Sequence, residues 1–140
     1  MRIKRTFILF ASVLVIIVLF ASWWNIPVRF LNHVSAGEVA RIEVIGAKWE
    51  EFVITEPKDI EYIVGNIQSV SLKKEKISLT YAGAGILLSF FDRNGNKIEE
   101  FKINYYNTIR KDPFFYHSTT DDLCMDYLIE LENRLGEYHE

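Results

Sequence analysis

The sequence predicts an α+β protein: an N-terminal transmembrane helix, then an antiparallel sheet of about five to six strands with two helices packed on one face. Three observations support this fold class: one long apolar run near the N-terminus, short alternating runs separated by turn residues, and two amphipathic stripes. We expect a cytoplasmic stub and transmembrane signal anchor at 1–27, a juxtamembrane linker at 28–38 and an extracytoplasmic α+β domain at 39–140.

The apolar run covers residues 7–24, where Ser12 and Ser22 are the only polar side chains. Eighteen residues form about 27 Å of helix, close to the ~30 Å thickness of a hydrocarbon core. Twelve of the eighteen are Leu, Ile, Val or Phe, and each favours insertion by roughly 0.3–0.6 kcal/mol. The run therefore predicts a helix that spans the membrane.

Charged residues near this run predict its orientation. Arg2, Lys4 and Arg5 precede it, whereas Arg29 alone follows closely. The flank of a transmembrane helix that carries more Lys and Arg usually remains in the cytoplasm. We therefore expect a single-pass protein of the cell membrane with a cytoplasmic N-terminus and its C-terminal domain outside. A cleaved signal peptide is the alternative, since residues 34–36 (Val-Ser-Ala) resemble a cleavage site, although the run exceeds the usual apolar length of about 7–15 residues.

The remainder of the chain is acidic. From Gly37 onward it has 12 Lys+Arg and 19 Asp+Glu, a net charge of −7. This charge argues against nucleic acid as a partner and against a domain that lies flat on anionic lipid. Cys124 is the only cysteine, so the domain has no internal disulfide and no cysteine that could accept a lipid after the apolar run.

Short apolar runs and turn residues predict the strands. Asn94-Gly95 between two apolar runs is a strong hairpin signal, because both residues tolerate positive φ. Residues 70–79 carry several charges and are typical of an edge strand or an exposed loop, and residues 81–85 predict a flexible joint. The expected hairpins pair 39–45 with 49–55, 86–91 with 98–105, and 108–111 with 114–117.

Two helices are predicted from spacing of the i, i+3, i+4 type. In the first, Thr55 is a candidate N-cap and Pro57 suits the first turn. The second is expected to open at Ser118 or Thr119 and to stop at Gly136. Their buried stripes are Ile60, Ile63, Val64 and Ile67 in the first helix, and Leu123, Cys124, Tyr127, Leu128, Leu131 and Leu135 in the second.

No group of residues has the spacing of a catalytic, cofactor or metal site, and we expect none. The loop from Asp92 to Asn96 places its glycine fourth, whereas a calcium loop needs it sixth. His117, Ser118 and Asp121 are close in sequence, which does not by itself create triad geometry. Helix capping explains them better, and core packing explains Cys124.

Aromatic side chains are the best candidates for binding a partner. Adjacent residues of a strand point to opposite faces, so Tyr106 and either Phe115 or Tyr116 should lie on the outer face of the sheet. Trp49 on the first hairpin is a fourth candidate. Exposed aromatic patches mark binding sites, whereas ordinary filling of the sheet is the alternative explanation.

The chain resembles small exported proteins of low-GC Gram-positive bacteria in the order of its parts. These parts are the anchor, the first hairpin, the helix start Thr-Glu-Pro-Lys-Asp-Ile-Glu, the hairpin Phe-Phe-Asp-Arg-Asn-Gly-Asn-Lys and the Leu-rich closing helix. Such proteins are membrane-anchored or lipoprotein-type and mostly uncharacterised. The resemblance covers roughly residues 39–135 and implies a location in the cell envelope. It assigns no functional residue.

Three functional hypotheses follow. The first is a non-enzymatic binding or regulatory module that contacts a protein partner outside the membrane, without a cofactor. The second is an accessory subunit whose transmembrane helix packs against a larger membrane complex. The third is a small envelope hydrolase that uses His117 with a nearby nucleophile.

Overall fold

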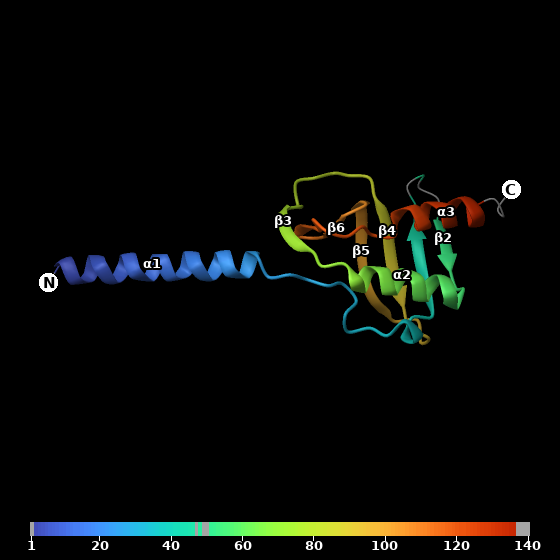
Figure 1. The fold of residues 1–140 in the computed structure, drawn as a ribbon, viewed down its shortest axis with the longest axis horizontal. Helices are drawn as coiled ribbons and strands as arrows, with labels where there is room; N and C mark the ends of the chain where they lie inside the picture. Colours follow the sequence, from blue (N-terminus) through green and yellow to red (C-terminus); the bar gives the residue numbers. More distant parts are fainter. Residues whose placement is uncertain (1, 47, 49–50, 137–140) are drawn as a thin grey trace.

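The computed structural model describes residues 2–46, 48 and 51–136 (Figure 1). It is an α+β fold with one seven-stranded antiparallel sheet. The helices are α1 Arg2–Trp24, α2 Pro57–Ser69 and α3 Met125–Gly136, with a 3-10 turn η1 at Ala36–Glu38. The strands are β1 Arg41–Ile45, β2 Glu51–Ile54, β3 Lys73–Ile77, β4 Ile86–Phe91, β5 Lys97–Tyr105, β6 Thr108–Lys111 and β7 Phe114–His117.

Helix α1 projects away from the folded domain (Figure 1). Within the described part of the chain, its 22-residue segment Ile3–Trp24 is the one helix long and apolar enough to cross a membrane. None of its most apolar 18-residue window is buried against the rest of the chain. At about 1.5 Å per residue it is roughly 33 Å long, close to the thickness of a hydrocarbon core.

The strand order across the sheet is β2-β1-β4-β5-β6-β7-β3, and every neighbouring pair is antiparallel. All three predicted hairpins are confirmed, although in the Asn-Gly turn only Gly95 has a positive φ, of 82°. Seven strands exceed the expected five to six. The charged segment 70–79 does form an edge strand, because backbone hydrogen bonds to β7 require no apolar side chains.

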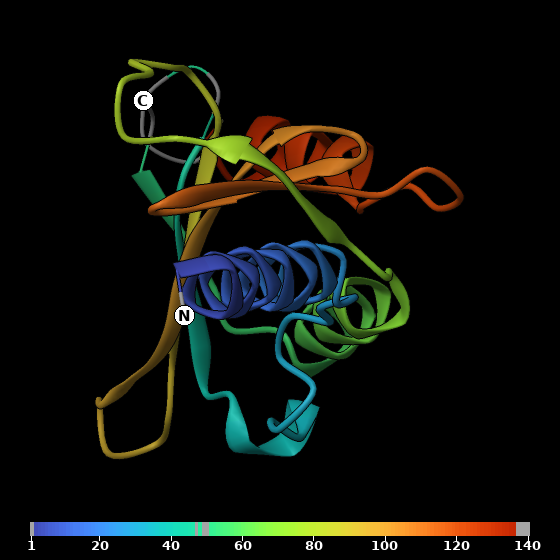
Figure 2. The same ribbon diagram turned by 90° about the vertical axis from the view of Figure 1, so that its left-hand side faces the viewer.

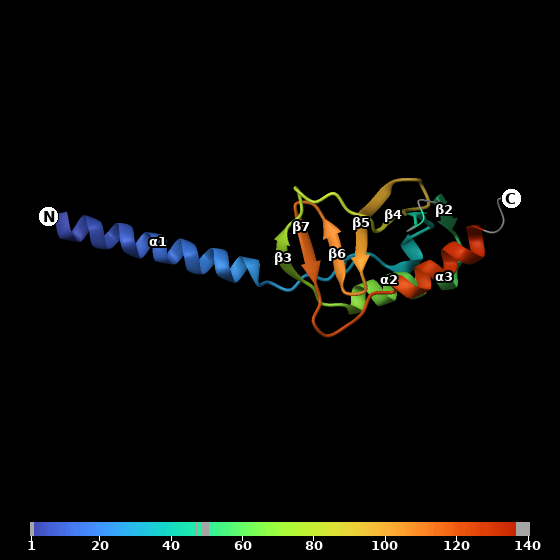
Figure 3. The ribbon, with the colours of Figure 1, turned by 90° about the horizontal axis from the view of Figure 1, so that it is seen from above.

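The core lies between the sheet and the two helices α2 and α3, which cover the same face (Figure 3). The predicted stripe of α2 is confirmed, since all four residues are buried. The helices also contact each other: the rings of Tyr62 and Tyr127 lie 4.4 Å apart, and Asp59 accepts hydrogen bonds from the Tyr127 hydroxyl at 2.6 Å and from Arg134 at 3.0 Å.

Both helices begin later than the sequence predicts. Glu56, rather than Thr55, occupies the N-cap of α2 and forms no side-chain cap bond, whereas Pro57 lies in the first turn as expected. Helix α3 begins at Met125, so Ser118 does not cap it. Instead the buried Ser118 hydroxyl accepts the N–H groups of Thr120 (3.4 Å) and Asp121 (3.2 Å), and this turn starts the loop that connects β7 to α3.

The segment expected as a juxtamembrane linker is part of the packed domain. Phe30, Leu31 and Val34 are buried in the core, and Val28 forms an isolated antiparallel bridge with Leu72. The domain therefore includes residues that sequence reasoning assigned to a separate linker at 28–38.

Ile63→Ala and Leu128→Ala should each destabilise the domain, because both side chains are fully buried. Large-to-small core changes cost about 2–5 kcal/mol, a large part of a typical stability of roughly 5–15 kcal/mol. We expect both variants of the full chain in mild detergent to unfold at a clearly lower urea concentration by circular dichroism. The exposed Glu130→Ala is the control, and equal midpoints for all three would contradict the helical faces described.

Candidate functional site

The outer face of the sheet, opposite the helices, is covered on one half only. The loop 78–85, between β3 and β4, passes over β5, β6 and β7. The Tyr81 ring packs edge-on against Phe115 at 5.5 Å, and the Tyr81 carbonyl accepts a hydrogen bond from Arg110 at 2.7 Å. Asn104 donates to the Ala84 carbonyl at 2.8 Å. The segment predicted as a flexible joint is thus held against the sheet.

Gly85 permits this close approach. A Cβ at Gly85 would lie only 3.0 Å from the Ile103 carbonyl oxygen, and real Cβ atoms rarely tolerate so short a contact with backbone. The loop consequently covers the outer face of β6, β7 and the end of β5, and leaves that of β1, β2, β4 and the start of β5 uncovered.

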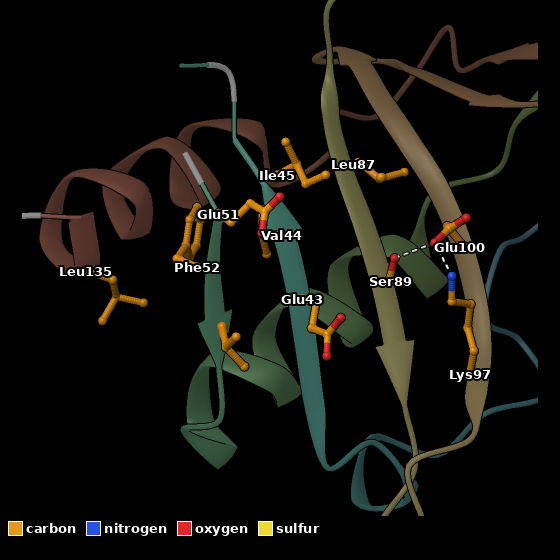
Figure 4. A pocket seen from close by; sticks show the side chains of 11 residues that line it. Glu43, Val44, Ile45, Glu51, Phe52, Leu87, Ser89, Lys97, Glu100 and Leu135 are labelled. Carbon is orange, nitrogen blue, oxygen red and sulfur yellow. Dashed lines mark hydrogen bonds and ion pairs between the residues drawn. The ribbon is translucent and has the colours of Figure 1, made fainter. Parts of the chain in front are cut away.

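A cleft of about 750 Å³ lies over the uncovered half (Figure 4). We call its outward-facing residues the open face. Its residues lie two positions apart on each of β1, β2 and β4, as expected for strand side chains that point to the same face. The face combines apolar with charged or polar side chains. The open face consists of Glu43, Ile45, Glu51, Val53, Leu87, Ser89, Lys97 and Glu100.

Glu100 is the most strongly bonded of these residues. Its Oε2 accepts hydrogen bonds from Lys97 Nζ and, at 2.5 Å, from Ser89 Oγ across the β4–β5 pairing (Figure 4). The hydrogen bond from Lys97, followed by that from Ser89, lowers the pKa of Glu100. A carboxylate with a lowered pKa is a poor general base near neutral pH. Glu100 is therefore poorly suited to activate Ser89 as a general base.

The other predicted site residues lie in separate places. Tyr106, 49% exposed, occupies the β5–β6 turn, where a hydrogen bond to the Asp126 carboxylate raises its pKa. Phe115 is on the outer face, but it is only 7% exposed beneath Tyr81. Tyr116 points to the opposite face and packs edge-on against Phe30 at 5.1 Å; its burial raises its pKa.

Trp49 lies outside the described residues. The expected aromatic patch is therefore not formed by Tyr106, Phe115 and Tyr116. Of Phe115 and Tyr116, the two β7 residues expected as alternatives, Phe115 points to the outer face. It fills the space beneath the loop 78–85.

The residues of the hydrolase hypothesis have structural contacts. His117 Nδ1 lies 3.3 Å from the Thr108 hydroxyl. The Ser118 hydroxyl accepts hydrogen bonds from the backbone N–H groups of Thr120 and Asp121. Cys124 is buried in the core, where desolvation raises the pKa of its thiol to about 12. Within the described part of the chain, no group of three or more His, Cys, Asp or Glu side chains could hold a metal ion.

Sequence reasoning missed the open face. Ser89 interrupts the apolar run Ile86–Phe91, and that interruption was the available signal. Its pairing with Glu100 depends on the register of the β4–β5 hairpin.

Comparisons with protein-family models, with curated proteins and with solved structures find no match to this chain.

The Glu100 cluster predicts a pH dependence of stability. Because the folded pKa of Glu100 is lowered, its stabilising effect is fully present above the unfolded pKa of ~4.3 and is lost as pH falls through the folded pKa. Between about pH 6 and about pH 3, the free energy of unfolding should therefore fall more for the unmodified chain than for Glu100→Gln. Urea titrations at each pH measure this difference. Glu130→Gln is the control, and identical pH profiles for Glu100→Gln and the unmodified chain would contradict the role of the cluster.

Proposed function

We propose that the chain is an uncleaved, single-pass membrane protein whose domain lies outside the cytoplasm and binds a protein partner through the open face. The observation that carries the proposal is the one-sided covering of the sheet: helices cover one face, a loop covers half of the other, and the remaining half contains a cleft. The length and apolar surface of α1 support the anchor.

The composition of the open face supports a protein as partner. Leu87, Ile45 and Val53 offer apolar area, and Val53 is 49% exposed. Glu43, Glu51 and Glu100 outnumber Lys97 among the charged side chains. Protein interfaces combine apolar contacts with a polar rim. The complementary partner would present basic side chains around apolar ones.

The anchor is tested by topology. Expressed in a bacterium, the mature chain should retain Met1 to Ala36 and sediment with membranes, because a longer apolar run than that of a signal peptide is expected to remain in the bilayer. N-terminal sequencing of the membrane fraction measures this. Externally added protease should digest the domain of intact spheroplasts. Soluble protein that begins near Gly37 would refute the anchor.

Partner binding is tested by site-specific photo-crosslinking in cells that naturally produce the protein. A photoreactive amino acid at Leu87 should capture one discrete protein, whereas the same group at the exposed Tyr62 on α2 should not. Val53→Arg should reduce capture at least about tenfold, since it adds positive charge where a basic partner docks; a loss of 1.4 kcal/mol in binding suffices for that factor.

Glu61→Arg introduces the same side chain on the exposed surface of α2 and should leave capture unchanged. Both variants should keep the melting temperature of the unmodified chain. Capture by positions in α1 alone, unaffected by Val53→Arg, would instead favour an accessory subunit that docks through its transmembrane helix.

A further inference from the structure

Strand β3 lies beside the end of α1. Lys74 Nζ donates to the Trp23 carbonyl at 3.2 Å and lies 4.2 Å above the Trp23 ring. The rings of Trp23 and Trp24 pack edge-on against Phe114 of β7, at 5.8 Å and 5.6 Å. Viewed from the α1 side, β3 and β7 cross the domain next to the axis of this helix (Figure 2). If α1 spans a bilayer, the β3 edge is the part of the sheet that faces its surface.

This edge is basic although the domain is acidic. Strand β3 carries three lysines and one glutamate, and neither Lys73 nor Lys76 is paired with a carboxylate by a described salt bridge. Lys76 lies 4.6 Å from the centre of the Tyr81 ring. Ile77 and Leu79 follow immediately and are 54% and 65% exposed. Lysines next to exposed apolar and aromatic side chains are typical of surfaces that meet a membrane interface.

A pocket of about 410 Å³ lies at this edge, between the start of β3, the end of β7 and the loop after it. Hydroxyl, ammonium and imidazole groups dominate its lining, and all three can donate hydrogen bonds to phosphate oxygens. Glu75 contributes one opposing carboxylate. The lining residues are Ser71, Lys73, Lys74, Glu75, His117, Thr119 and Thr120.

We propose that this pocket binds the phosphate headgroup of an anionic phospholipid in the membrane that holds α1. The inference rests on the anchoring proposed above and is independent of the open face. Lys73, which pairs with His117 on β7, supplies positive charge to the phosphate, while the Thr119 hydroxyl donates to its oxygens. The Thr120 hydroxyl already donates to Asp121 at 2.7 Å. The next residue of β3, Lys74, points to the opposite face and donates to the end of α1, so a bound headgroup would fix the domain at one orientation on the bilayer.

The test uses hydrogen exchange of the full chain in nanodiscs of phosphatidylglycerol or of phosphatidylcholine. Segments 71–75 and 117–120 should exchange about tenfold more slowly in phosphatidylglycerol, as expected when the lipid is present at roughly ten times its dissociation constant. Lys73→Gln combined with Thr119→Ala should abolish the difference. Lys58→Gln, which removes the same charge from the exposed surface of α2, should preserve it.

Equal exchange in the two lipids, with the chain incorporated in both, would overturn the headgroup site and leave the anchor intact. Protection by inorganic phosphate in phosphatidylcholine discs as strong as that by phosphatidylglycerol would assign the pocket to a free anion and also overturn the proposal. A chain that fails to co-purify with either nanodisc would contradict the anchor itself.

Discussion

The placement of the sheet relative to α1 depends on the short segment that joins them, because that segment is built into the core. Phe30, Leu31 and Val34 are buried, and Gln68 of α2 donates to the carbonyls of Leu31 at 2.7 Å and of Val34 at 2.6 Å. Leu31 has φ of 60°, a conformation that costs a non-glycine residue about 1–3 kcal/mol. The buried Leu31 side chain and the Gln68 bond offset this cost, so the chain leaves α1 in a fixed direction.

That direction gives the two edges of the sheet different surroundings. Strand β3 lies at the end of α1, whereas β2 is the opposite edge of the seven-stranded order. Six spacings of about 4.8 Å separate them by up to ~29 Å. Three lysines lie on β3, while Glu43, Glu51 and Glu100 lie on the open face towards β2. The net charge of −7 from Gly37 onward therefore conceals a basic edge on β3. The expectation that the domain does not lie flat on anionic lipid applies to the acidic open face and not to β3.

Local patterns predicted the elements well. Helical spacing identified the buried residues of α2, and Asn94-Gly95 located the β4–β5 hairpin, because both signals depend only on near neighbours. β3 pairs with β7, which lies some forty residues further along the chain. This pairing depends on backbone hydrogen bonds, so the charged side chains of β3 do not reveal its partner. The burial of Phe30 and Leu31 was missed for a related reason: only the tertiary fold brings α2 over them.

The candidate sites were the least predictable part. Either Phe115 or Tyr116 was expected on the outer face, and Phe115 lies there. It is buried beneath Tyr81, which belongs to a loop whose sequence has no periodicity that could predict this contact. The open face requires the register that sets Ser89 against Glu100. The pocket at β3 combines residues from two strands and a loop that are separated by more than forty positions.

We infer that the β3 edge lies at the membrane surface and that β2 points away from it. Quenching of a fluorophore by lipids that carry a nitroxide on the headgroup tests this most directly. The label is placed on Leu79→Cys or on Val53→Cys in nanodiscs, and native Cys124 stays unlabelled because it is buried and its thiol pKa is raised to about 12. We expect strong quenching at position 79 and little at position 53. Equal quenching at both, or stronger quenching at position 53, would contradict this placement of the sheet relative to the membrane.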